Sequence, residues 1–314
     1  MRAYIDESYA DRHTAADEGT VNEMLFPVGA YVLNSKVAEW GTGKVLALGE
    51  SDRRRVFFEF GGERLMPTGV LVEAAAMDDS PLFAHLDARM DLHGARSFLQ
   101  MEKAFKDAYA QGFDDPKYLA GEREYKVAAS TLMAELCSRQ ALSDLLAKED
   151  YAAVCDRAKR IVSKANLIFP NEKRALNDGF KQGAPAHRLF ATSFYDVLYG
   201  EGEFGGRFEA FVSALEELGA LKWTTATYFP FLAHPGRYPF VKPSYVQEAA
   251  KAYAFDLGYA PRPSWRGYAR VMAFVRYVED VLQRRGELAP HDLIDVQGFI
   301  WCTLHTQAKG GKVR

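Results

Sequence analysis

The residues best suited to chemistry lie between Leu221 and Trp301, where aromatic side chains alternate with prolines and isolated polar groups. Four prolines predict a rigid, irregular loop between helices, and they are Pro230, Pro235, Pro239 and Pro243. Rigid loops on a helical scaffold are common places for functional sites. Five aromatic side chains of this stretch could stack on nucleobases, at about 1 to 3 kcal/mol per base, and they are Tyr228, Phe229, Phe231, Tyr238 and Phe240. Alternatively, these rings fill the core beneath the loop.

Two carboxylates, Asp292 and Asp295, open the last helix that the sequence predicts. Their spacing at a helix start suits capping and interaction with the helix dipole. The functional interpretation is that Asp295 points into an aromatic cleft, where its negative charge stabilises a cationic transition state. Lys242 lies between Pro239 and Pro243 and is the expected cationic partner, contacting phosphate or a base. We expect the base pocket to be lined by Tyr228, Phe231, Gln297 and Trp301.

Arginines at four-residue spacing suggest a nucleic-acid backbone contact. Arg262, Arg266 and Arg270 fall on one face of a predicted helix, and no acidic residue four positions away neutralises them. Residues 234–314 hold twelve Lys and Arg against seven Asp and Glu, a net charge of +5. We expect these three arginines and Arg237 to contact DNA phosphates, with a solvated charged face as the alternative.

Several function classes are disfavoured by composition and motifs. A chain of 314 residues that is 48% hydrophobic and 26% charged is neither disordered nor a disulfide-dense scaffold. Three cysteines without a C-x-x-C pair predict neither disulfides nor a thiolate zinc site. The motifs of phosphate loops, dinucleotide-binding folds, zinc proteases, kinases and serine hydrolases are missing. We therefore expect no metal and no organic cofactor. A charged N-terminus and the lack of long apolar runs predict a cytoplasmic protein.

The chain is expected to consist of three parts. Residues 1–26 form an acidic extension, since the first 23 residues hold six Asp and Glu against two Arg. Residues 27–75 contain short alternating apolar runs separated by glycines, which are typical of antiparallel strands. Residues 76–314 show the helical spacing of apolar residues and predict roughly eight to ten helices.

The fold class that follows is α+β and mostly α, with a small N-terminal SH3-like β-barrel followed by a large all-helical domain. In the run RVFFEF, Val56, Phe58 and Phe60 share one face of a strand, and Gly61 and Gly62 supply a hairpin turn. The long helix is expected to be capped by Ser264 and to end at Arg285.

Two parts of the sequence resemble known families. The string EWGTGKVLAL and the run RRRVFFEFGGERLMPTGVL resemble SH3-like or Tudor-like modules of bacterial DNA-handling proteins. The blocks NLIFPNEKRALNDGF, LKWTTATYFPFLAHPGRYPFVKP and PHDLIDVQGFIW resemble a bacterial helical family associated with phage defence. The block HPGRYPFVKPSYVQEAA is similar to the last part of helix-hairpin-helix DNA glycosylases, although the L-P-G-V-G hairpin is missing and a lysine stands about where their acid would be.

These resemblances imply base flipping and base excision from modified phage DNA, for example of glucosylated hydroxymethylcytosine, in antiviral defence. The expected partner is double-stranded DNA, with Asp295 and Lys242 as the catalytic pair. The alternative is a non-catalytic nucleic-acid reader or adaptor of a defence or restriction system. A third hypothesis, a subunit that binds only proteins, leaves the arginine pattern without a role.

Overall fold

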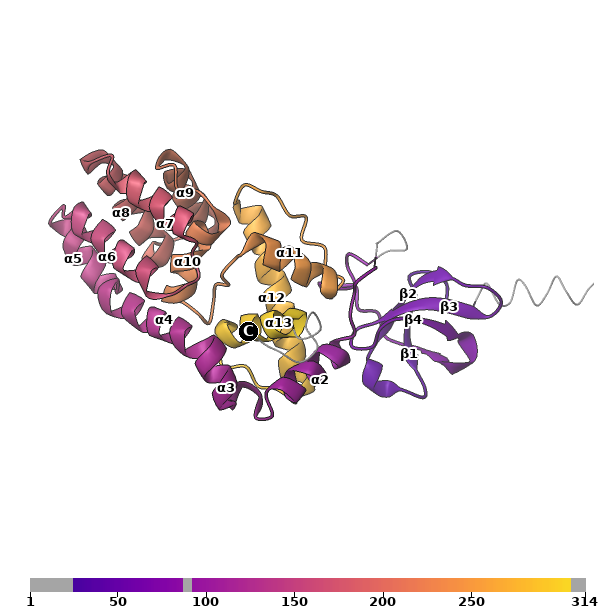
Figure 1. Ribbon diagram of the computed structural model, residues 1–314. Coiled ribbons are helices and arrows are strands. Elements are labelled where there is room, and N and C mark those ends of the chain that lie inside the picture. Colours follow the sequence, from indigo (N-terminus) through magenta and orange to yellow (C-terminus); the bar gives the residue numbers. More distant parts are fainter. Residues whose placement is uncertain (1–24, 87–91, 306–314) are drawn as a thin grey trace, which may run out of the picture. The chain divides into compact units, whose positions relative to one another are not determined.

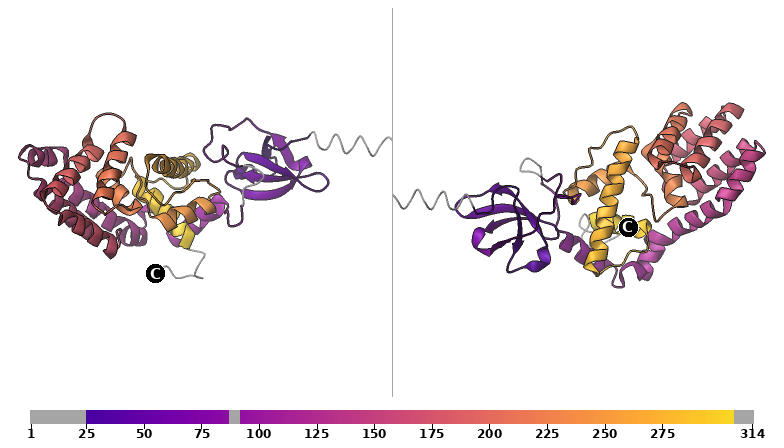
Figure 2. Two further views of the ribbon diagram at one scale, coloured as in Figure 1. Left: turned by 90° about the horizontal axis from the view of Figure 1, so that it is seen from above. Right: turned by 180° about the vertical axis from the view of Figure 1, so that it is seen from behind.

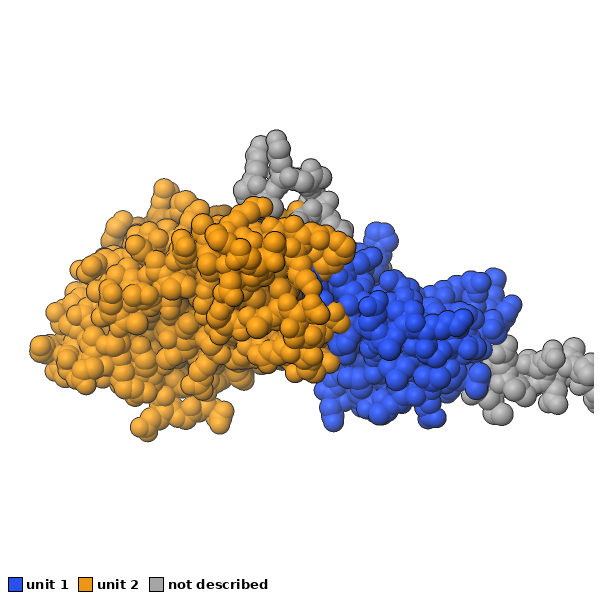
Figure 3. Space-filling view, turned by 90° about the horizontal axis from the view of Figure 1, so that it is seen from below, with its two compact units in different colours: residues 1–102, 251–255 blue, residues 103–250, 256–314 orange. Residues whose placement is uncertain are grey.

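The computed structural model describes residues 25–86 and 92–305. Most of the predicted acidic extension, residues 1–24, therefore lies outside the described residues. The chain divides into two compact units (Figure 3). Unit 1 comprises the residues up to 102 together with residues 251–255, and unit 2 comprises residues 103–250 and those from 256 onward. The segment from 76 to 102, which the sequence assigned to the helical part, groups with the strands.

Unit 1 is built on a five-stranded antiparallel sheet (Figure 1). Its strands are β1 (Tyr31–Asn34), β2 (Gly43–Leu48), β3 (Arg53–Phe58), β4 (Gly62–Pro67) and β5 (Leu71–Glu73). Their order in the sheet is β4-β3-β2-β1-β5, so consecutive strands from β1 to β4 are neighbours and β5 returns beside β1. Short 3₁₀ turns at Ala38–Trp40 and Thr68–Val70 connect strands.

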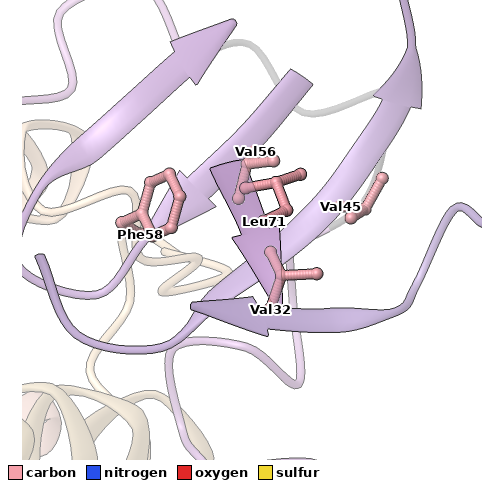
Figure 4. Packing of buried hydrophobic residues seen from close by; sticks show 5 residues of the cluster. All are labelled: Val32, Val45, Val56, Phe58 and Leu71. Atoms are coloured by element: carbon pink, nitrogen blue, oxygen red, sulfur yellow. The ribbon is translucent and has the colours of Figure 1, made fainter. Parts of the chain in front are cut away.

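The sheet encloses a small apolar core (Figure 4). The side chains of this core come from four of the five strands and are Val32, Val45, Val56, Phe58 and Leu71. Val56 and Phe58 are two residues apart in β3 and both point into this core, as the two-residue period of a strand predicts. The hairpin between β3 and β4 turns at residues 59–61, so Phe60, which was expected on the strand, lies in the turn. Gly62, which was expected in the turn with Gly61, instead pairs with Phe58 as the first residue of β4, and its φ of 71° lies in the left-handed region that glycine adopts without strain.

The remaining elements of the described chain are helical, and the chain passes from unit 1 to unit 2 within the first of these α-helices. They are α2 (Phe98–Ala108), α3 (Pro116–Tyr118), α4 (Glu124–Leu136), α5 (Arg139–Ala147), α6 (Tyr151–Lys164), α7 (Pro170–Phe180), α8 (Ala184–Tyr199), α9 (Phe204–Glu217), α10 (Trp223–Ala233), α11 (Pro243–Ala252), α12 (Trp265–Arg285) and α13 (Leu293–His305). A 3₁₀ turn at Gly112–Asp114 precedes α3, and a π-helical turn at Leu119–Arg123 joins α3 to α4. The α+β, mostly helical class is confirmed.

Local signals explain where the long helix α12 begins and ends. The Ser264 hydroxyl accepts a hydrogen bond from the Gly267 N–H, which satisfies one of the unpaired donors of the first turn. At the other end Gly286 adopts a left-handed φ of 70° and closes the helix. The predicted cap and the predicted end of this helix are both confirmed.

The core of unit 2 is rich in phenylalanine. Helix α8 packs against α6 and α9, and α10 packs against α4 (Figure 2). The rings of Phe190 and Phe194 stack with centroids 5.1 Å apart, and Phe229 of α10 meets Phe194 edge-on at 4.9 Å. Such aromatic contacts add stability beyond the area they bury.

The proline-rich stretch differs from its prediction. Pro230 lies inside α10 and Pro243 begins α11, so of the four prolines only Pro235 and Pro239 lie in the connection between the helices. A proline is tolerated at a helix start because that N–H needs no intrahelical partner. Burial explains the interior proline, since every residue from Trp223 to Leu232 is buried and packing outweighs the lost hydrogen bond. No helix among the described residues is long and apolar enough to cross a membrane.

Candidate functional site

A cavity of about 190 Å³ lies within unit 2. Its lining comes from the π-helical turn, α4, the α6–α7 loop, α10, the α10–α11 loop, α11 and α13. The lining side chains are Glu122, Tyr125, Lys126, Asn166, Leu167, Phe231, Phe240, Lys242, Tyr245, Gln297 and Trp301. An apolar cavity of about 150 Å³ holds a benzene molecule, so this cavity has room for a planar ring.

The α10–α11 loop is held against the helices by specific hydrogen bonds. The Gln297 amide donates to the Phe240 carbonyl at 2.5 Å and accepts from the Phe240 N–H at 3.2 Å. The next residue, Val241, donates its N–H to the Thr227 hydroxyl at 3.0 Å. The Tyr268 hydroxyl donates to the Pro239 carbonyl at 2.7 Å. These bonds fix the wall that carries Phe240 and Lys242.

Aromatic rings form two sides of the cavity. Tyr245 of α11 and Trp301 of α13 contact each other with centroids 4.5 Å apart, and Trp301 stacks on His305 at 4.0 Å. Phe231 and Phe240 lie 6.0 Å apart in a tilted arrangement. Flat apolar walls of this kind suit a planar ligand.

A carboxylate and an amine line the cavity from adjacent turns of one helical segment. Glu122 belongs to the π-helical turn and Lys126 to α4, and the Lys126 Nζ donates to the Glu122 Oε2 at 3.4 Å. Lys126 is only 6% exposed. Burial lowers the pKa of the Lys126 ammonium, and the nearby Glu122 carboxylate opposes this shift. π-helical turns occur frequently at functional sites.

Lys242 lines the same cavity, but its ammonium contacts an aromatic ring and not a carboxylate. Its ammonium lies 4.5 Å from the ring centroid of Phe169, a cation–π contact. Phe169 is 51% exposed and precedes α7. The Phe169 N–H donates to Glu172, whose other carboxylate oxygen accepts from the Thr224 hydroxyl of α10. An exposed aromatic ring of the α6–α7 loop and a cation of the α10–α11 loop therefore lie together beside the cavity.

Asp295 is fully buried and is not among the residues that line this cavity. One carboxylate oxygen accepts hydrogen bonds from the Tyr118 hydroxyl at 2.9 Å and from Arg123 at 2.7 Å. The other accepts from the backbone N–H of His291 at 2.9 Å and lies 2.6 Å from its ring Nδ1. Burial and the Asp295 carboxylate both raise the pKa of Tyr118.

Arg123 and Asp292 complete this buried polar cluster. The Arg123 guanidinium donates to both oxygens of Asp292, at 2.9 and 3.0 Å. Burial alone would lower the pKa of Arg123, but its bonds to Asp292 and Asp295 raise it overall. Asp292 also accepts the Ile294 N–H at 2.9 Å, as a residue at a helix start does. The cluster ties the π-helical turn to the start of α13.

The structure therefore brings four of the predicted site residues to one cavity: Phe231, Lys242, Gln297 and Trp301. Tyr228 is fully buried, donates its hydroxyl to the Ile161 carbonyl at 3.0 Å and contacts Phe240 edge-on. It lies in the core beside the wall instead of in the lining. Asp295 lies behind the lining, two residues before Gln297 on α13.

The prediction that Arg262, Arg266 and Arg270 share one face of a helix is wrong. Helix α12 begins at Trp265, so Arg262 precedes it. Arg262 is held by two hydrogen bonds to the Glu216 carboxylate, at 3.1 and 2.7 Å, a partner 46 residues away in sequence that no local spacing reveals. Arg266 is exposed on α12, and Arg270 is half-buried and donates to the Leu257 carbonyl at 3.4 Å. Arg237 is exposed with its guanidinium 5.8 Å from the Tyr238 ring.

Glu122 and Lys126 are the charged cavity residues that the sequence analysis did not identify. Their spacing of four within EREYK is that of an ordinary ion pair on an exposed helix face. The signal that would distinguish them is burial, which depends on the distant residues that surround the cavity.

Among the residues that the structure describes, no group of three or more His, Cys, Asp or Glu side chains could hold a metal ion. Comparisons with protein families, with curated proteins and with solved structures give no match for this chain.

Proposed function

We propose that this protein is a DNA glycosylase that turns a modified base out of the duplex and excises it in the cavity of unit 2. Base excision requires a pocket that accepts one flipped base, flat walls that stack on it and a negative charge near the sugar. The observation that carries the proposal is that a ring-sized cavity combines aromatic walls, the Glu122 carboxylate and two lysines.

Glu122 is the carboxylate that the proposal places at the reacting sugar. Cleavage breaks the bond between C1′ and the base nitrogen, builds positive charge on the sugar and adds a water oxygen to C1′. The departing base nitrogen takes up a proton and the attacking water loses one. A carboxylate lining the cavity stabilises this charge and orients the water.

The remaining polar groups hold the substrate. Lys242 carries a positive charge beside the exposed Phe169 ring, which suits contact with a phosphate flanking the flipped nucleotide. The amide of Asn166, which also lines the cavity, is available to hydrogen-bond a base edge. The catalytic role predicted for Asp295 stays a prediction. In our proposal Asp295 fixes Arg123, and through it the turn that carries Glu122.

Strand breakage in modified DNA tests this proposal. The protein is incubated with phage DNA containing glucosylated hydroxymethylcytosine, the substrate that the sequence resemblance suggests, and with unmodified DNA. Both are then heated in alkali, which breaks strands at abasic sites. We expect breaks only in the modified DNA and a loss of at least 100-fold in Glu122→Gln, because one charge-stabilising group typically contributes about that factor.

Glu124→Gln is the matched control. Glu124 lies two residues away and is exposed, so its loss should leave cleavage unchanged. Asp295→Asn, assayed at a temperature where it is folded, distinguishes the roles of the two carboxylates. If Asp295→Asn loses all cleavage activity and Glu122→Gln retains it, catalysis is assigned to Asp295. Binding of modified DNA by the wild type without any breaks would reject excision and favour a non-catalytic reader.

A further inference from the structure

Three arginines lie around one histidine in unit 2, away from the residues that line the cavity. We call this group the arginine patch, and its members are Arg139, Arg207, Arg237 and His234. Arg139 begins α5, Arg207 lies in the first turn of α9, and the other two residues follow α10. None of the four lines the cavity of unit 2. The patch is therefore a separate candidate for a binding site.

Aromatic contacts hold two of the arginines beside the histidine. The His234 ring meets the rings of Tyr199 and Tyr238 edge-on, with centroids 5.6 and 5.9 Å apart. The Arg139 guanidinium lies over the Tyr199 ring at 5.4 Å from its centroid. The Arg237 guanidinium lies over the Tyr238 ring at 5.8 Å. Each of these guanidiniums is therefore positioned by a ring that contacts His234.

Arg207 reaches the same group of rings through Phe204. Its guanidinium lies 5.4 Å from the centroid of the Phe204 ring, which stacks on Tyr238 at 4.1 Å. Its Nη1 donates to the backbone carbonyls of Asp196 and Val197, at 2.9 and 3.3 Å. These carbonyls belong to the last turn of α8. They hold the guanidinium in place and leave its positive charge without a counter-charge.

The charges of the three arginines act on one imidazole. Burial lowers the pKa of His234, its hydrogen bond to the Leu198 carbonyl opposes this shift, and the three arginines lower the pKa further. In the described parts of the chain no carboxylate oxygen lies within 4.0 Å of a nitrogen of these three guanidiniums, although the Asp196 side chain lies near Arg207. Positive charge therefore gathers around a histidine whose neutral form is favoured.

Two of the arginines also lie at helix ends where a cation is disfavoured. The helix dipole makes an N-terminus positive, so it attracts anions and repels cations. Arg139 is the first residue of α5 and Arg207 lies in the first turn of α9, and neither first turn contains an acidic residue. Like charges gathered beside two positive helix ends repel one another unless an anion binds among them.

We propose that the arginine patch binds a phosphate group that carries two or more negative charges, as a phosphate monoester or a diphosphate does. Guanidiniums form paired hydrogen bonds with phosphate oxygens, and a ring beneath the guanidinium orients it before the ligand arrives. Phosphodiesters of a duplex carry one charge each and are spaced along the strand, so the cations that contact them are spread out. Three arginines around one imidazole suit a single group of higher charge.

This inference goes beyond the proposed function and does not depend on it, because no patch residue lines the cavity. A free nucleotide and the phosphorylated end of a DNA strand share the chemistry that the patch recognises. The experiment therefore begins with a probe that contains only phosphate and then distinguishes these two sources.

Isothermal titration calorimetry of the full chain with inorganic pyrophosphate, at pH 7 and constant ionic strength, tests the site. We expect the wild type to bind, and Arg139→Gln and Arg237→Gln each to weaken binding by about 10-fold or more, because each variant loses a charge-assisted contact. Both side chains are exposed, so both variants should fold like the wild type.

Arg188→Gln is the matched control, since Arg188 is an exposed arginine of α8 outside the patch. It should bind pyrophosphate like the wild type. Absence of binding by the wild type, or equal weakening in Arg188→Gln, would overturn the proposal.

Two further titrations distinguish the sources, each with the wild type and with Arg139→Gln. One uses ADP, and the other compares an oligonucleotide bearing a 5′-phosphate with its 5′-hydroxyl form. Binding of ADP that requires Arg139 would identify a nucleotide site, and such binding of the 5′-phosphate form alone would identify a DNA end. Equal binding of both oligonucleotides that still requires Arg139 would overturn the proposal, because the patch would then contact phosphodiesters. No base is removed in these titrations, so their outcome is independent of the test for excision.

Discussion

Two carboxylates near the cavity differ in how many hydrogen bonds they accept from the protein. Asp295 accepts hydrogen bonds from Tyr118, Arg123 and the His291 backbone, and it is fully buried. Glu122 receives one long bond from Lys126 and lines the cavity. A carboxylate surrounded by donors stabilises the fold, whereas one facing a cavity is available to a ligand.

Asp295→Asn should therefore destabilise the protein strongly. The change leaves Arg123 facing a neutral amide and places amide donors toward the Tyr118 and His291 donors. We expect the free energy of unfolding to fall by about 3 to 5 kcal/mol, the usual cost of breaking a buried ion pair. Urea denaturation monitored by circular dichroism measures this change.

Asp178→Asn provides the matched comparison. Asp178 pairs with Lys181 at 2.7 Å, but both side chains are exposed. Surface pairs contribute about 0 to 1 kcal/mol, so this variant should unfold like the wild type. Equal losses in the two variants would show that the Asp295 cluster is not a stabilising one.

At the scale of elements, α13 connects the buried cluster to the cavity. Asp295 lies on its first turn, and Gln297 and Trp301 reach the cavity from the next two turns. Between them Gly298 lies so close to Tyr118 that an added Cβ would be 2.3 Å from the hydroxyl oxygen. The small residue is what permits Tyr118 to reach Asp295.

Gly298→Ala should consequently displace Tyr118 and weaken the cluster. We expect a loss of about 1 to 3 kcal/mol, as for overpacking elsewhere, although alanine favours helices. Gly206→Ala on α9 is the control, because nothing lies within 4 Å of its added Cβ. That variant should gain up to about 1 kcal/mol. Thermal unfolding of both variants tests whether the two substitutions change stability in opposite directions. A stabilised Gly298→Ala would contradict the proposed packing.

Elements with strong local signals were predictable. The shared strand face of Val56 and Phe58, the cap at Ser264 and the helix end at Arg285 each follow from residues close together in sequence, and the structure has them. Phe60, expected on the same strand face, lies in the turn after β3. Pro230 was misplaced because helix packing outweighs the proline signal. The π-helical turn at Leu119–Arg123 leaves no comparable local pattern.

The cavity was partly predictable because some of its lining residues lie in one stretch of the sequence. Phe231, Lys242, Gln297 and Trp301 belong to one dense segment of the sequence, and they do meet at the cavity. Glu122 and Lys126 come from a segment more than 100 residues earlier. Their burial depends on how distant helices pack, which residue spacing along the chain does not encode.

At the scale of the whole molecule, an arginine that already pairs with a carboxylate is less available to bind a DNA phosphate in the proposed complex. DNA affinity that depends on phosphate contacts falls steeply as salt rises from about 50 to 200 mM, by a slope that counts those contacts. Arg262 is already bound by Glu216, whereas Arg266 is exposed on α12. The two positions should therefore behave differently in the proposed DNA complex.

Arg266→Ala should weaken DNA binding similarly for all sequences and reduce the salt slope by about 1, because one phosphate contact is lost. Fluorescence anisotropy titrations with a labelled duplex at several salt concentrations measure both quantities. The control is the double variant Arg262→Ala with Glu216→Ala, which removes a neutral pair and should leave the slope unchanged. Wild-type affinity of Arg266→Ala at every salt concentration would place the DNA-binding surface away from this face of α12.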